Sequence, residues 1–195
     1  NGIISFDPIP LWTLTFTDGV QDTILKPSNF ATFQYQTYSD RLVLSWTGQT
    51  IVPEYTPLSV NVEIKLGSQL QNDEGVGFTI MIDNEAQRAL YDISFPNLRI
   101  KSFGDPAKSI LFDPFGAGIL RRPFIESPVI TVRGNPSTES SMQFFSLYNY
   151  ELNKQLYFQT LDSDGYSKDF VTATSSNDLV LGVAQYPENN VIPRL

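Results

Sequence analysis

The sequence contains no cysteine and no histidine. Without cysteine there is no disulfide and no thiol nucleophile. Without histidine there is no Ser-His-Asp triad and no histidine-based pH switch, and together the two absences exclude the usual zinc and copper sites. The chemistry that remains is that of carboxylates, Lys, Tyr, Ser and Thr, and of oxygen-liganded metals such as calcium.

Positive charge is also scarce, with 13 Lys and Arg against 21 Asp and Glu and a net charge of −8. Arg121-Arg122 is the one adjacent basic pair. This balance argues against nucleic-acid binding and against adhesion to an anionic membrane. No apolar run approaches the roughly 18 residues of a membrane-spanning helix, so we expect no membrane insertion.

The remaining composition, rich in aromatic and neutral polar residues, favours an extracellular, cell-surface or virion location. The sequence starts at Asn1 instead of Met, which indicates either a removed leader or an artificial start.

Strict alternation of apolar and polar residues is the dominant pattern. It is clearest over 58–66, where every even position is apolar and every odd one polar. A polar stretch over 67–75 and a second apolar segment over 76–82 follow. Period-2 alternation is typical of strands with one buried face, so the sequence predicts a hairpin lying on a core.

Similar segments along the chain predict an all-β fold, an antiparallel two-sheet β-sandwich of concanavalin A-like or jelly-roll type with about ten to twelve strands. The length predicts a single domain over 1–195, with an extended N-terminal arm (1–10) and a C-terminal tail (187–195). At most one short helix is expected, over 83–90, with Asp83 or Asn84 as its N-cap.

Two connections have distinctive composition. The turn residues of 162–165 predict a hairpin between strands at 156–160 and 166–174. The stretch 104–128 combines Gly and Pro with many apolar residues, which predicts a long loop. This loop is either a crossover packed over one end of the sandwich or a surface that binds a partner.

Three segments resemble concanavalin A-like lectins and glucanases in their order. They are VNVEI (60–64) followed by GVGFTI (75–80), then NKQLYFQ (153–159), then DLVLGVA (178–184). The resemblance implies the β-sandwich architecture of that family and, with it, glycan binding. The chain lacks the clustered Asp, Asn, His and Glu of the legume-type metal loop and the Glu-x-Asp-x-x-Glu strand of the glucanases, so no active site is carried over.

Two acidic turns are candidate sites. Asp162 and Asp164, with Asp169 beyond, could bind calcium through their carboxylates, although Asp-x-Asp-Gly also forms a tight hairpin turn. Asn72 and Asp73 lie at a predicted hairpin tip and could accept hydrogen bonds from sugar hydroxyls. No other cofactor is expected.

Tyrosines are the remaining candidates, because sugar rings stack on aromatic side chains that tolerate partial exposure. Trp12 and Trp46 fall on alternating apolar faces, which favours the core. Tyr55 in a Pro-flanked loop and Tyr166 just after a turn are expected to be exposed. Tyr148 and Tyr150 share a face of one predicted strand and could form a platform, and Tyr150 lies in a polar setting. These four tyrosines are the ligand-binding candidates.

These observations predict a non-enzymatic carbohydrate-binding or adhesive β-sandwich. One alternative is a structural jelly-roll subunit of a viral capsid, vertex or appendage, contacting itself or other subunits through 104–128 and the termini. The other is a glycoside hydrolase-like enzyme, which needs a carboxylate pair. Glu63 falls on the polar face of its predicted strand, and Asp83 and Glu85 lie just beyond the next strand, but nothing places two of them in a cleft.

Overall fold

The computed structural model is all-β and antiparallel, and it describes twelve ranges of the chain. The ranges are 4–5, 9–17, 19–50, 57–67, 75–85, 89–101, 105–113, 118–121, 129–135, 144–161, 168–175 and 178–186. No helix within them is long and apolar enough to cross a membrane. The chain divides into two compact units, which are described separately: unit 1 comprises Asn1–Trp12 and Leu90–Leu195, and unit 2 comprises Thr13–Ala89. The assignment of 1–195 to a single domain stays a prediction.

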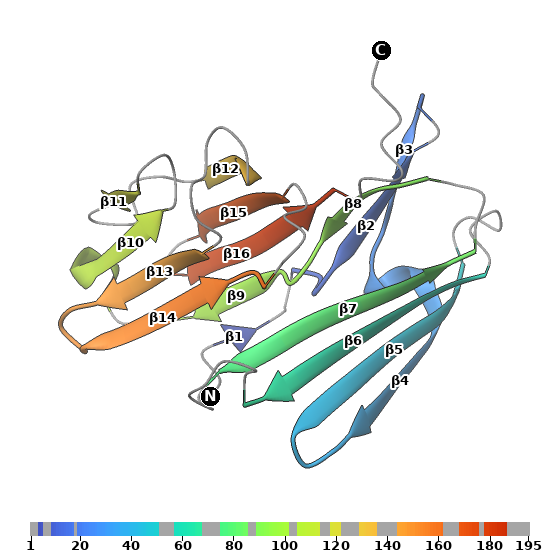
Figure 1. The fold of residues 1–195 in the computed structure, drawn as a ribbon, viewed down its shortest axis with the longest axis horizontal. Coiled ribbons are helices and arrows are strands. Elements are labelled where there is room, and N and C mark those ends of the chain that lie inside the picture. The colour runs from blue at the N-terminus through green and yellow to red at the C-terminus, as the bar shows by residue number, and fades with distance from the viewer. Residues whose placement is uncertain are drawn as a thin grey trace. The chain divides into compact units, whose positions relative to one another are not determined.

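Unit 2 is built around a four-stranded meander, with strands in the order β4-β5-β6-β7 (Figure 1). The bounds of its elements are β2 Thr13–Thr17, β3 Asp22–Leu25, η1 Pro27–Asn29, β4 Phe30–Thr37, β5 Arg41–Gln49, β6 Leu58–Leu66 and β7 Val76–Asn84. The β6–β7 hairpin confirms the predicted one, and Val62 pairs with Ile80 in its register. Because paired residues share a face, Val60 and Val62 fall on the apolar side and Asn61 and Glu63 on the polar side.

Unit 1 contains two sheets. In the first, β16 is central: it pairs with β8, β9 and β15, while β1 adds to β9 and β12 to β15. In the second, the order is β11-β10-β13-β14. The bounds are β1 Ile4–Ser5, β8 Ala89–Ser94, β9 Leu98–Lys101, η3 Pro106–Lys108, β10 Ser109–Asp113, β11 Ile119–Arg121, β12 Val129–Asn135, β13 Phe144–Asn149, β14 Lys154–Gln159, β15 Lys168–Ser175 and β16 Asp178–Gln185.

The two sheets of unit 1 pack face to face as a β-sandwich. Phe145 of β13 and Phe170 of β15 are each 1% exposed, and their rings meet edge to face at 6.0 Å. Leu111 and Leu147 are buried on the same side of the second sheet, while Leu181 and Val183 are buried on β16. Alternation along β10 and β13 therefore assigns one face of the second sheet to the core and leaves the other open.

The buried positions of Trp12 (0% exposed) and Trp46 (6% exposed) confirm their core assignment. Strand β1, within the predicted N-terminal arm, pairs with β9. The tail 187–195 lies outside the described residues. The strands run to β16, more than the expected number, because β1, β3, β10 and β11 lie in stretches where no strand was expected.

Three expectations are wrong. Asp83 and Asn84 belong to β7 and Ala89 and Leu90 to β8, so the stretch expected to be helical is occupied at both ends by strands. Sheet pairing overrides the weak helix preference there, because propensity is a weak prior against tertiary contacts.

The predicted hairpin between 156–160 and 166–174 does not form. Strand β14 pairs with β13, whereas β15 pairs with β12 and β16 in the other sheet of the sandwich. Turn composition favours a chain reversal but does not specify the strand that pairs after it.

The stretch 104–128 is not one irregular loop. It contains η3 and the β10–β11 hairpin, in which Phe112 pairs with Leu120. Several of the apolar residues that suggested a packed loop belong to these strands, where Ile110 and Leu111 are buried.

Candidate functional site

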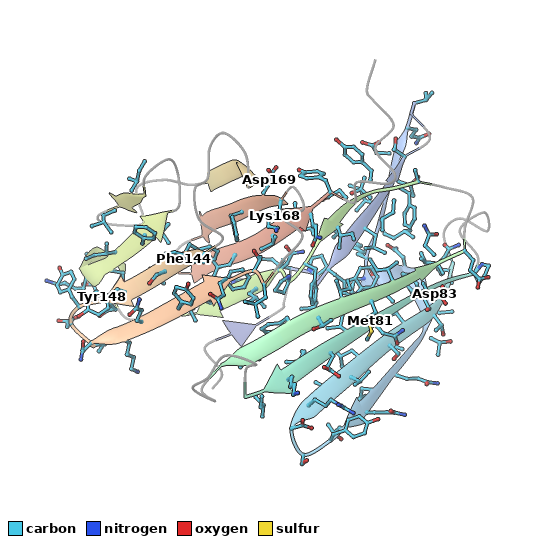
Figure 2. The ribbon with its side chains drawn as sticks, viewed as in Figure 1. Met81, Asp83, Phe144, Tyr148, Lys168 and Asp169 are labelled. Carbon is cyan, nitrogen blue, oxygen red and sulfur yellow. The ribbon has the colours of Figure 1, made fainter. Side chains whose placement is uncertain are left out.

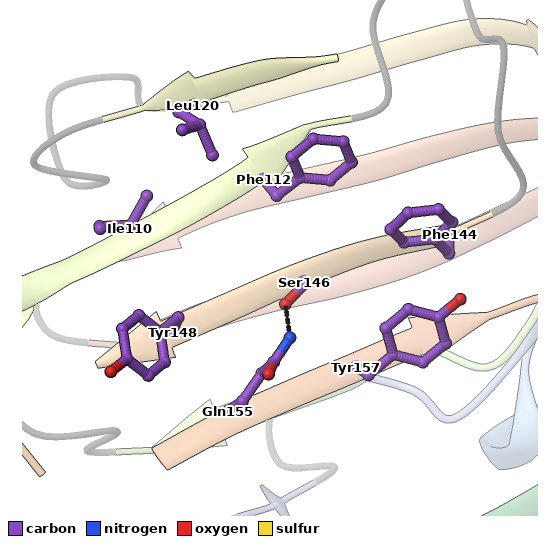
Figure 3. Close-up of a pocket in the computed structure, with 8 residues that line it drawn as sticks. All are labelled: Ile110, Phe112, Leu120, Phe144, Ser146, Tyr148, Gln155 and Tyr157. Carbon is purple, nitrogen blue, oxygen red and sulfur yellow. Dashed lines mark hydrogen bonds between the residues drawn. The ribbon is translucent and has the colours of Figure 1, made fainter. Parts of the chain in front are cut away.

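The open face of the second sheet of unit 1 carries a hollow of about 490 Å³ (Figure 3). We call this surface the aromatic face, and its residues are Ile110, Phe112, Leu120, Phe144, Ser146, Tyr148, Gln155 and Tyr157. The volume falls within the range of roughly 300–1,000 Å³ that is usual for small-molecule sites.

Strand register brings these side chains together from four strands. Ser146 pairs with Phe112 on one side and with Tyr157 on the other, and Tyr148 pairs with Ile110 and Gln155. Directly paired residues in an antiparallel sheet point to the same face, so alternate residues of β10, β13 and β14 line the hollow. The intervening residues form the buried face described above.

Three rings form a row across the sheet. Phe112 stacks on Phe144 at 5.4 Å between centroids, and Phe144 stacks on Tyr157 at 5.0 Å. Phe112 and Phe144 are half-buried, while Tyr157 is 49% exposed. The row therefore ends in a ring that is held by its neighbours and still open to solvent.

Polar groups lie beside this row, as Figure 3 shows for Ser146 and Gln155. The Gln155 amide donates to Ser146 Oγ (2.8 Å), and the Tyr148 hydroxyl donates to Asn153 Oδ1 (3.1 Å). Asn153 has a φ of 50°, a left-handed conformation that Asn tolerates better than most residues, and it belongs to the turn between β13 and β14. A Gln side chain has several hydrogen-bonding positions, of which the bond to Ser146 uses one.

The structure places one of the predicted ligand residues in the hollow. Tyr148 lines it, whereas Tyr150 lies beyond the end of β13, 48% exposed, with the Lys108 ammonium 6.0 Å from its ring centroid. The other four predicted residues lie outside the described residues: Tyr55, Asn72, Asp73 and Tyr166.

Sequence reasoning missed Phe112, Phe144, Gln155 and Tyr157. Phe144 and Phe145 are adjacent aromatics, and the sequence alone does not show which of them faces the core. Phe112 belongs to a stretch expected to be a loop. The signal that could have found the others is the alternation of Phe144, Ser146 and Tyr148, with Gln155 and Tyr157 two positions apart on the next strand.

Of the proposed calcium ligands, Asp162 and Asp164 lie outside the described residues. The Asp169 carboxylate accepts a hydrogen bond from the Tyr186 hydroxyl (2.8 Å). Burial raises the pKa of Tyr186. The hydrogen bond to Asp169 and the negative charge of the Asp169 carboxylate raise this pKa further, because each favours the protonated phenol. Within the described ranges no three acidic residues cluster as a metal site.

Glu63 and Asp83 of the β6–β7 hairpin are too far apart for the carboxylate pair of a glycosidase. Glu63 pairs with Thr79, and Asp83 lies four residues further along β7 on the same face (Figure 2 labels Asp83). Four strand residues span about 13 Å, beyond the roughly 5–9.5 Å of glycosidase carboxylates. Glu63 instead lies 3.6 Å from Arg41 Nε.

No protein-family model and no curated protein sequence matches this chain.

Proposed function

We propose that this protein is a non-enzymatic carbohydrate-binding β-sandwich, displayed outside the cell or on a particle surface, and that the aromatic face is its glycan site. The observation that carries the proposal is the Phe112–Phe144–Tyr157 row beside Ser146, Tyr148 and Gln155. The CH faces of a pyranose are apolar and its rim is hydroxylated, so a sugar needs an aromatic surface and amide or hydroxyl partners at one place.

The aromatic face supports a neutral glycan over a charged one. None of its residues carries a formal charge, and the chain as a whole has a net charge of −8. An anionic sugar would meet no cation in the hollow and would be repelled by the rest of the chain.

The site is also preorganised, which lowers the entropic cost of binding. The rings are held in place by stacking, and the Gln155 and Tyr148 side chains are fixed by hydrogen bonds to Ser146 and Asn153.

The test is a neutral-glycan array followed by calorimetry on the oligosaccharide that binds best. Tyr157→Ala removes the open end of the row and should weaken binding by about tenfold, the effect of losing one stacked aromatic ring. Gln155→Ala, which removes an amide at the same rim, should weaken binding by a smaller factor.

The matched control is Tyr35→Ala, which removes a tyrosine that is 66% exposed on unit 2. It should leave glycan affinity unchanged. Absence of binding to every neutral glycan, or equal affinity for the Tyr157→Ala and Tyr35→Ala variants, contradicts the proposal.

A further inference from the structure

Strand β4 is an open edge of the unit 2 meander (Figure 1). Every residue from Ala31 to Thr37 is exposed, including Phe33 (54%) and Tyr35 (66%). At the opposite edge, exposed residues of β7 alternate with partly covered ones. The two edges of the sheet therefore differ, and β4 is the more accessible.

The backbone of β4 presents hydrogen-bonding groups at this edge. The Tyr38 amide donates to the Arg41 carbonyl (2.8 Å), which marks Tyr38 and Arg41 as a hydrogen-bonded pair. Bonded and non-bonded pairs alternate in an antiparallel ladder, so Gln36, Gln34 and Thr32 bond to β5. The N–H and C=O groups of Phe33, Tyr35 and Thr37 consequently point away from β5.

None of the usual devices that protect a sheet edge is present in β4. Its sequence, FATFQYQT, has no charged residue, no proline and no glycine. Natural proteins block exposed edges with Lys, Pro, bulges or very short strands, because an open edge is a template for another strand. An eight-residue uncharged edge is suited to pairing.

We propose that β4 is a self-association surface, on which β4 of a second copy pairs antiparallel about a two-fold axis at Gln34. This inference is independent of the glycan proposal, since the aromatic face belongs to unit 1. It describes an isologous dimer in which two four-stranded sheets continue as one.

The register follows from the two faces of the sheet. A two-fold axis perpendicular to the sheet keeps apolar residues opposite apolar ones only if the paired residue numbers have an even sum. With Gln34 on the axis, Phe33 of one copy faces Tyr35 of the other, twice, and Thr32 faces Gln36. Phe33 packs on Trp46 of β5 at 5.2 Å, and its ring, 54% exposed, can be covered further by Tyr35 of the second copy.

A second copy of the chain fits this edge for electrostatic reasons. Each chain carries a net charge of −8, so two copies repel one another at long range, a term that salt screens, and an uncharged contact strand adds no local repulsion to it. The paired strands contain no charged residue, and no like charges face each other across the ladder. The exposed rings of Phe33 and Tyr35 are covered on association.

Disulfide cross-linking tests the register, because the chain has no cysteine of its own. In Gln34→Cys, the two cysteines form a non-hydrogen-bonded pair with Cα atoms about 4.5 Å apart, close enough for a disulfide. We expect a covalent dimer on mild oxidation at concentrations where the unoxidised protein dimerises. In the control, Gln36→Cys, the cysteines are about 13 Å apart and should not cross-link. Equal cross-linking of both variants overturns the register.

Light scattering of the full chain over a concentration series tests the dimer itself. Tyr35→Pro removes a backbone N–H that points away from β5 and forms no bond within the β4–β5 ladder. The dimer loses one such donor from each copy, so association should weaken by about tenfold. Gln34→Lys, which keeps the backbone intact, places like charges across the axis and should weaken it by about fivefold. A monomer at every concentration, without Gln34→Cys cross-linking, overturns the proposal and leaves the edge to a strand of a different protein.

Discussion

Two four-stranded sheets, one in each unit, bring aromatic side chains to the surface in different ways. In unit 1, β13 is buried along most of its length, and the exposed Tyr157 is stacked at the end of a row of rings. In unit 2, β4 is exposed along nearly all of its length, and Phe33 and Tyr35 lie at an open edge. The first arrangement supports a preorganised small-molecule site, whereas the second supports pairing with another strand.

The difference arises from what covers the second face. Phe145 packs on Phe170 across the unit 1 sandwich, so a second sheet covers one face of β13. The apolar face of the β4–β7 sheet is buried at Trp46, Leu58 and Val60, but it is partly open at Ile64 and Phe78. Aromatic residues thus serve packing where a sheet face is covered, as at Phe145 and Trp46, and remain accessible at the open edge strand β4.

The largest expected effect is the difference in unfolding free energy between the Phe145→Ala and Phe33→Ala variants. Phe145 is 1% exposed and touches Phe158 and Phe170, so its removal leaves a cavity between the sheets and should lower the free energy of unfolding by about 3–5 kcal/mol. Phe33→Ala should cost less than about 1 kcal/mol because the ring is already half in water. Urea unfolding measures both, and similar losses would remove the distinction.

Asn149 provides the second test, since it is the fully buried polar residue at the end of β13. Its Nδ2 donates to the Asp105 carbonyl (3.2 Å) and to Ser109 Oγ (3.0 Å), and its Oδ1 accepts from the Leu152 amide (2.9 Å). Asn149→Ala removes all three bonds and takes the acceptor from the Leu152 amide, although Ser109 Oγ still donates to the Asp105 carbonyl (3.3 Å), and it should lower the free energy of unfolding by about 2–3 kcal/mol. Gln34→Ala, at an exposed β4 position, is the control and should change it little.

Two glycines sharpen the comparison further. A Cβ at Gly182 would lie 2.6 Å from Asn97 Oδ1, which also accepts a hydrogen bond from Ser94 Oγ, so Gly182→Ala should cost about 1–3 kcal/mol. At Gly77 the nearest atom, the Lys65 carbonyl oxygen, is 3.9 Å away, and Gly77→Ala should be tolerated. Thermal unfolding of both variants is the measurement. Adding Asn97→Ala to Gly182→Ala should recover part of the loss, and no recovery would contradict the steric explanation.

The smallest effect concerns pH and the Tyr186–Asp169 pair of unit 1. Burial raises the Tyr186 pKa above its ordinary value of about 10, so its contribution to stability is complete below about pH 10 and is lost as the pH rises towards the raised value. The wild-type free energy of unfolding should therefore fall above about pH 10 more steeply than that of Tyr186→Phe. Parallel pH profiles of the two proteins, followed by urea unfolding, would contradict this assignment.

Part of the fold could be predicted from residues alone. The alternation over 58–66 and 76–82 predicted the β6–β7 hairpin and its inward-facing valines, and Trp12 and Trp46 were correctly assigned to the core. Local pattern was insufficient where a strand pairs with a distant one. Strand β14 follows β13 and pairs with it, but the next strand, β15, joins the other sheet of the sandwich.

Less of the candidate site could be predicted. Tyr148 was identified because it shares a strand face with Tyr150, but most of its neighbours in the hollow come from β10, β11 and β14. The stacking of Phe112 on Phe144 depends on the register between β10 and β13, although the two residues are more than 30 positions apart in the sequence. No local feature of Phe112 distinguishes it from the apolar residues around it.

The sequence by itself determined the strand character of this protein, the chemistry it lacks and which face of the β6–β7 hairpin is apolar, because side-chain alternation and composition are local properties. Only the tertiary structure decided that Phe144 faces outward while Phe145 faces the core, that β10 brings Phe112 to the same face, and that β4 remains an open edge. These outcomes depend on which strands pair and which face a second sheet covers, and both are set by contacts between residues far apart in the chain.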